Sequence, residues 1–197
     1  MPSLNLRLLA YVLVLALVLV APVYAQTTEY TIASESNLYV DGTSNSTPEW
    51  RVYATQIDGT LSMDEEGSVV SVQLVVPSKM MKSRKSPIMD RGMYGALKAN
   101  EHPEIVYELA SVSDFAASDD GTFTLNAAGN LTIAATTQEI LIPVEGVSQE
   151  DGSVHFTGTH TMLMTDYGLK PPSMMFGQFR TGDELVITFE LIAVPGE

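Results

Sequence analysis

Short runs of alternating apolar and polar residues recur along the chain, and turn signals separate them. Between positions 68 and 76 every second residue is apolar, and the shared face is formed by Val70, Val72, Leu74 and Val76. The same period of two recurs at 105–109, 140–144 and 185–191. Because neighbouring side chains on a strand point to opposite faces, this pattern predicts strands with one buried face. We expect about eight or nine strands, most of them joined as an antiparallel meander.

Clusters of Gly, Asp, Glu and Ser predict the turns between these strands. They lie at 65–67, 119–121, 149–152 and 181–183. The segment from Trp50 to Leu61 is predicted to form one long strand, with a bulge or bend at Asp58-Gly59.

A helical period replaces the alternation in one segment, residues 86–99. Ser86-Pro87 has the pattern of an N-cap followed by proline at the first helical position. Met89, Met93 and Leu97 follow at intervals of four, which places them on one stripe of a helix. Many antiparallel strands with one short helix indicate either a closed barrel or a sandwich. A closed eight-stranded barrel has room inside for side chains or for one small ligand.

The first 25 residues have the layout of a secretory signal peptide. Arg7 precedes an apolar run from Leu8 to Ala21, and Val23-Tyr24-Ala25 supplies small residues for cleavage after Ala25. A retained membrane anchor is the alternative, although the apolar run of about 14 residues is shorter than the roughly 20 that a spanning helix needs. Residues 26–197 then form one domain, which we expect in a bacterial periplasm or outside the cell.

Acidic residues dominate the composition. The chain has 24 Asp and Glu against ten Lys and Arg, a formal net charge of −14, and no cysteine. Removal of residues 1–25 takes away Arg7 and leaves nine basic residues. Nucleic acid is excluded as a main partner, because phosphate binding needs a basic surface. Six of the nine basic residues nevertheless lie within twenty positions, where they form either a solvated loop or a site for an anionic head group: Lys79, Lys82, Arg84, Lys85, Arg91 and Lys98.

No arrangement of residues indicates catalysis. The three histidines, His102, His155 and His160, lie at no spacing typical of a catalytic triad or a zinc helix, and there is no Gly-x-Ser-x-Gly elbow. We therefore expect neither an enzyme nor a bound cofactor or metal. His160, Met162 and Met164 do share a strand face by parity, and such soft ligands could hold Cu(I). The alternative for the methionines is flexible core filling or the adaptable lining of a lipid pocket.

Four stretches carry more specific motifs, in this order: Ser36–Ser44 leading to Trp50; Met89–Lys98 followed by His102–Tyr107; Gly129–Ile133 with Ile140–Val144; and Thr165–Pro172 followed by Gly177 and Thr181–Val186. Together they resemble the motifs of the YceI-like family of exported, lipocalin-like barrels that bind polyisoprenoids and related lipids. The resemblance covers about Tyr30 to Ala193. Two positions depart from it: Ala135 stands where the family usually has glycine, and the turn before Trp50 lacks a histidine that relatives often have.

The resemblance implies a mainly β fold, a single extended antiparallel barrel of about eight strands with one short helix beside it. It also implies an apolar tunnel that holds an isoprenoid chain, such as a quinone or polyprenyl lipid. From strand parity and the helical stripe, we predict that the tunnel is lined by Val72, Leu74, Met93, Leu97, Tyr107, Ile140, Ile142, Phe156, Met162, Met164, Ile187 and Phe189. Head-group contacts are assigned to Lys82, Arg84 and Lys85.

The function expected from the sequence is therefore storage, transport or protection of a lipid chain. No stable membrane insertion is expected once the signal peptide is removed, and a homodimer is left open. Two alternatives remain: a barrel filled by its own side chains with a structural or interaction role, and a copper-handling protein.

Overall fold

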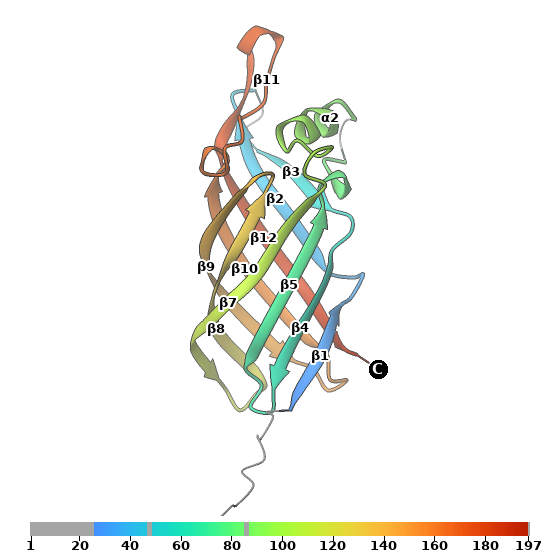
Figure 1. Ribbon diagram of the computed structural model, residues 1–197, viewed down its shortest axis with the longest axis vertical. Coiled ribbons are helices and arrows are strands. Elements are labelled where there is room, and N and C mark those ends of the chain that lie inside the picture. Colours follow the sequence, from blue (N-terminus) through green and yellow to red (C-terminus); the bar gives the residue numbers. More distant parts are fainter. Residues whose placement is uncertain (1–25, 47–48, 85–86, 197) are drawn as a thin grey trace, which may run out of the picture.

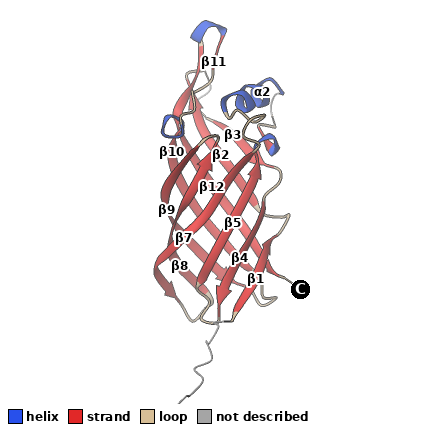
Figure 2. Cartoon of the chain, viewed as in Figure 1, coloured by secondary structure: helices blue, strands red, loops and turns tan. Residues whose placement is uncertain are grey.

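The computed structural model describes residues 26–46, 49–84 and 87–196, so the predicted signal peptide, Lys85 and the predicted N-cap Ser86 lie outside the described residues. Most of the described chain is antiparallel β-strand (Figures 1 and 2). The strands are β1 (Thr27–Ile32), β2 (Asn37–Ser44), β3 (Trp50–Ala54), β4 (Asp58–Asp64), β5 (Val69–Pro77), β6 (Met81–Lys82), β7 (Glu104–Ala117), β8 (Thr122–Ile133), β9 (Thr136–Ser148), β10 (Val154–Leu163), β11 (Ser173–Met174) and β12 (Phe179–Pro195). The helical elements are α2 (Pro87–Ala96) and three single 3₁₀ turns, η1 (Ser78–Met80), η2 (Met164–Tyr167) and η3 (Met175–Gly177).

The strands close into a barrel, and β12 makes the closure. Around the ring the strands follow the order β1, β4, β5, β7, β8, β9, β10 and β12, and β12 pairs back onto β1 through Ala193 to Pro195. The first part of β12, from Thr181 to Glu190, pairs instead with β2, which continues to β3 and β6. The expected fold class is thus confirmed: a mainly β, closed antiparallel barrel of eight strands, with one α-helix in the described part of the chain.

The two ends of the barrel differ in construction. At one end lie the turns that join β4 to β5, β7 to β8 and β9 to β10, and we call this the turn end (Figure 1). At the other end α2 and the hairpin between β11 and β12 project beyond the barrel wall, and we call this the mouth end (Figure 1). None of the described helices is long and apolar enough to cross a bilayer.

Buried side chains pack densely toward the turn end. The ring centroid of Phe123 lies 5.7 Å from that of Phe115 and 5.8 Å from that of Phe156. A Cβ atom at Gly146, directly opposite Phe123 on β9, would overlap the Phe123 ring, so this glycine leaves the space that the ring fills. Met63 and Val154 are buried in the same cluster. The barrel is therefore plugged at this end by its own core.

Three local predictions were wrong, and each error has a structural cause. A register shift between β4 and β5 turns Val69 inward, whereas Val70 is 54% exposed. The segment 50–61 is two strands, separated at residues 55–57 rather than bent at Asp58-Gly59. Residues 181–183 form no turn but lie inside β12, where the pairing with β2 shifts register between Thr181 and Leu185.

Candidate ligand-binding cavity

A cavity of about 630 Å³ occupies the barrel interior. Its wall extends from Leu61 and Phe156, above the plugged turn end, to exposed residues of the mouth end such as Ile88 and Phe179. Aliphatic, aromatic and methionine side chains form most of this wall. The volume lies within the range of about 300–1,000 Å³ typical of small-molecule sites. The cavity thus combines an apolar interior with access from the mouth end.

All twelve residues assigned to the tunnel from the sequence lie in the wall of this cavity. The alternation of β9 shows why: Ile140 and Ile142 face inward, while Leu141 between them is 57% exposed. Met89 and Met93 on α2, and Leu97 directly after its last residue, lie in the wall, as their spacing of four predicts. Their role in holding a ligand stays a prediction.

Several wall residues were not predicted. Many of them lie on strands whose alternation predicts a buried face, although they were not assigned to the tunnel. They include Val76, Ile105, Leu131, Ile133, Leu185 and Leu191. Met81 belongs to the two-residue strand β6, and it reaches the wall because β6 pairs with Ala54 of β3. No local periodicity could have indicated that long-range pairing.

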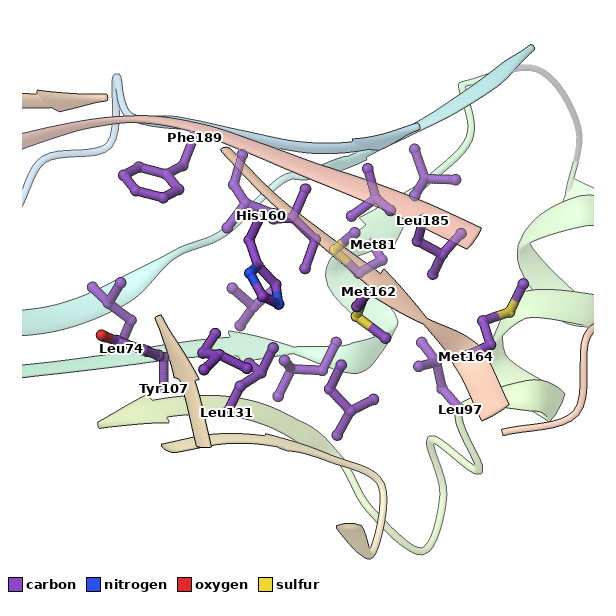
Figure 3. Close-up of a pocket in the computed structure, with 18 of the residues that line it drawn as sticks. Leu74, Met81, Leu97, Tyr107, Leu131, His160, Met162, Met164, Leu185 and Phe189 are labelled. Atoms are coloured by element: carbon purple, nitrogen blue, oxygen red, sulfur yellow. The ribbon is translucent and has the colours of Figure 1, made fainter. Parts of the chain in front are cut away.

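His160 is the imidazole in this apolar wall. It lies on β10 with Met162, and Met164 begins η2 directly after that strand. All three side chains point into the cavity (Figure 3). Burial away from water lowers the pKa of His160 below its ordinary value, so the imidazole is neutral at pH 7. The sulfur atom of Met81 also lies in this part of the cavity (Figure 3). The arrangement agrees with strand parity, and Cu(I) binding by these residues stays a prediction.

Tyr107 contributes a second polar group to the interior. Its ring lies in the cavity wall, and its hydroxyl oxygen is buried without a hydrogen-bond partner among the described residues. A Cβ atom at Gly129 would lie 2.6 Å from that oxygen, so the phenol rests against the β8 backbone. Burial raises the pKa of Tyr107 to about 12, which keeps the phenol protonated. A small displacement of the ring would let the hydroxyl donate a hydrogen bond to a polar atom of a ligand.

Two of the predicted head-group cations, Lys82 and Arg84, are not part of the described cavity wall. The Lys82 ammonium donates a 2.7 Å hydrogen bond to the Tyr94 hydroxyl, which raises the pKa of Lys82. The Arg84 guanidinium stacks over the Tyr53 ring, with its carbon 4.0 Å from the ring centroid. Lys85 lies outside the described residues. At the mouth end Arg180 does reach the wall, and its Nε donates to the Gly177 carbonyl at 3.0 Å. A head-group role for Lys82, Arg84 and Lys85 stays a prediction.

The fold is that of a closed antiparallel β-barrel with an apolar internal cavity. The sequence model of the YceI-like domain matches residues 30–193 of this chain. The chain therefore belongs to the YceI-like family. Comparison with curated proteins gave no significant match.

Solved structures share this fold at low sequence identity. BcnA from Burkholderia cenocepacia is 14% identical, with 81% of this chain and 96% of that chain covered and a TM-score of 0.64. A polyisoprenoid binding domain from Saccharophagus degradans is 9% identical over 87% of this chain and 100% of that chain, with a TM-score of 0.68. The YCEI protein of Campylobacter jejuni is 12% identical, with coverages of 74% and 84% and a TM-score of 0.57. At these identities the likeness concerns the fold alone.

Proposed function

We propose that the barrel holds the long apolar chain of an isoprenoid or a similar lipid, such as a quinone or a polyprenyl lipid. The observation that most supports this is the cavity of about 630 Å³ with its predominantly apolar wall. Membership of the YceI-like family and the fold shared with a polyisoprenoid binding domain support the same class of ligand. The protein would carry, store or protect the chain rather than transform it.

Chain burial would provide most of the binding free energy. Each CH₂ group moved from water into an apolar site contributes about 0.8 kcal/mol, so ten carbons contribute roughly 8 kcal/mol. Association itself costs about 4–15 kcal/mol. Short chains would therefore bind weakly and long chains tightly. Since the ionisable side chains in the described cavity wall are Tyr107, His160 and, at the mouth end, Arg180, recognition of polar groups would be loose.

Export is part of the proposal, because residues 1–25 have the layout of a cleaved leader. Expression of the full chain in a Gram-negative host tests it. We expect the protein recovered from the periplasm to have the intact mass of a chain that begins at Gln26. Recovery of the uncleaved chain in the membrane fraction would instead support the anchor.

A pair of tryptophan variants on β9 tests the site. Ile140→Trp places an indole in the cavity, while Leu141→Trp places one on the outer face of the same strand. Loss of contact with about three CH₂ groups should weaken binding of a polyprenol or a long-chain quinone by about 30- to 100-fold in the first variant. The second should bind as the unmodified protein does. Because the indole enters open space, the unfolding free energy of Ile140→Trp should fall by less than about 1.5 kcal/mol.

The assay is uptake of the lipid by the purified protein, followed by displacement of an apolar fluorescent probe. Equal affinities of the two variants would place the ligand elsewhere. Failure of the unmodified protein to take up any probe or lipid would contradict the proposal and favour a barrel with an interaction role.

A further inference from the structure

Charge is distributed unequally between the two ends of the barrel. Every Lys and Arg in the described part of the chain lies on an element of the mouth end, on β3, η1, β6, α2, β12 or the adjoining loops. These eight residues are Arg51, Lys79, Lys82, Arg84, Arg91, Lys98, Lys170 and Arg180. The three turns of the turn end contain acidic residues and no described cation: Asp64, Glu65, Glu66, Asp119, Asp120, Glu150 and Asp151. The described basic residues are therefore confined to the mouth end, and the turn end is acidic.

Exposed apolar side chains accompany the cations. Phe176 is fully exposed at the tip of the hairpin between β11 and β12, and its φ of 56° lies in the left-handed region that bulky residues rarely adopt. Across the opening, α2 presents Ile88, which is 61% exposed, and Met89. Phe179, which pairs with Met174 in the same hairpin, is also exposed. Since Ile88, Met89 and Phe179 also line the cavity, apolar surface continues from the interior to the outside.

We propose that the mouth end docks on the surface of an anionic lipid bilayer. Phe176 and Ile88 enter the boundary between head groups and acyl chains, and the surrounding cations contact lipid phosphates. Because the described cations all lie at the mouth end, this end is the one that can face such a surface, while the acidic turn end is repelled and points away. The cavity then opens toward the membrane. Passage of a lipid chain between bilayer and cavity rests on the proposed function, whereas docking itself does not.

The form of this surface favours a bilayer over a protein partner. Lys79, Arg91, Lys98 and Lys170 are exposed, lie on separate elements around the opening and make no ion pair within the described residues. Arg51, by contrast, is paired with Asp41 at 2.6 Å. A ring of separate cations with projecting apolar tips suits a fluid, negatively charged surface, which needs no fixed shape. Acidic residues of the mouth end, among them Glu49, Glu101 and Asp166, reduce the attraction, so binding is weak and reversible.

Co-sedimentation with lipid vesicles tests the docking. The protein, expressed with its leader and purified without detergent, is mixed with vesicles of phosphatidylcholine alone or with phosphatidylglycerol added. We expect binding to the anionic vesicles in about 0.1 M salt, and loss of binding near 1 M salt, where the Debye length is about 3 Å. Vesicles of phosphatidylcholine alone should leave the protein in the supernatant.

Matched variants compare the contributions of the mouth end and the turn end to vesicle binding. Arg91→Gln with Lys98→Gln should weaken binding about thirtyfold, because each surface cation contributes roughly fivefold. Glu65→Gln with Glu66→Gln neutralises two charges at the turn end and should leave binding unchanged. Phe176→Ser should also weaken it, and Val70→Ser, which removes an exposed apolar side chain near the turn end, should not. The far-ultraviolet circular dichroism spectrum and the thermal unfolding of each variant show whether the barrel is folded, independently of any ligand.

Equal effects at the two ends, or equal binding to both kinds of vesicle, would overturn the assignment of the mouth end. The protein could also self-associate without vesicles in a concentration-dependent way. If the Arg91 and Lys98 substitutions suppressed that self-association, the cations would contact the acidic end of another copy instead of a bilayer. Lipid uptake is measured without bilayers, so failure of docking leaves the proposed function intact.

Discussion

At the scale of single residues, the interior is apolar apart from a few polar groups, and His160 is the one whose state depends on pH near neutrality. The unfolded chain would protonate this imidazole near its ordinary pKa of about 6.5. In the folded barrel, loss of hydration lowers the pKa of His160. Below pH 6.5 the unfolded state therefore binds more protons than the folded state, and stability falls as the pH decreases toward the lowered pKa.

Replacement of His160 by leucine should remove this contribution. Urea unfolding at about pH 7.5 and about pH 5 should show a smaller loss of unfolding free energy for His160→Leu than for the unmodified protein. Thr161→Leu, on the outer face of the same strand, removes no titrating group and is the control. An identical pH dependence in His160→Leu and the unmodified chain would contradict this account of the imidazole.

The turn between β8 and β9 stores strain at one residue. Ile133 pairs with Thr136, so Ala134 and Ala135 alone form the turn, and Ala134 has a φ of 52°. A Cβ atom in this left-handed region costs about 1–2 kcal/mol. Ala134→Gly should therefore raise the unfolding free energy by about 1 kcal/mol. Ala135→Gly relieves no such strain and should lower the unfolding free energy slightly. Thermal unfolding of the two variants measures the difference. A more stable Ala135→Gly variant would show that the strain lies at Ala135.

At the scale of elements, glycines on the strands leave space for aromatic rings of neighbouring strands, whereas the glycines of α2 lie in open space. Gly146 on β9 lies beneath the Phe123 ring. A Cβ atom at Gly95 on α2 would have no atom of another element within 4 Å. The same substitution at these two glycines should therefore have opposite effects.

Gly146→Ala should lower the unfolding free energy by about 1–3 kcal/mol, because the added methyl group displaces a ring in a packed core. Gly95→Ala should raise it by up to about 1 kcal/mol through better helix propensity. Denaturant unfolding of both variants measures the contrast. A neutral Gly146→Ala would show that the Phe123 ring can move at little cost.

Strand parity predicted the interior well because period-two alternation is a local property of the chain. The inward positions of β9 and β10, such as Ile142 and Met162, were correct for this reason. Parity failed at Val70, where a register shift relative to β4 reverses the alternation, and such a shift depends on a partner strand. The choice between barrel and sandwich likewise depends on Ala193 pairing with Ile32, residues at opposite ends of the domain.

At the scale of the whole molecule, a plugged turn end, an apolar cavity and an open mouth end form one arrangement. The core around Phe123 closes the barrel on one side, and α2 with the β11 hairpin frames the other. Sequence alone showed a cluster of cations but not that it surrounds the opening, since Lys170 and Arg180 join it only through the fold. A chain that enters from the mouth end would lie along the barrel axis.

The central claim is that this cavity holds a lipid chain in the native protein, and native mass spectrometry tests it most directly. The full chain is expressed in a Gram-negative host, purified without detergent, and divided between intact-mass measurement and organic extraction. We expect an added mass that dissociates as one species and matches an extracted isoprenoid or acyl lipid. A protein mass without any adduct, which gains none when quinones and polyprenyl lipids are supplied, would contradict the account.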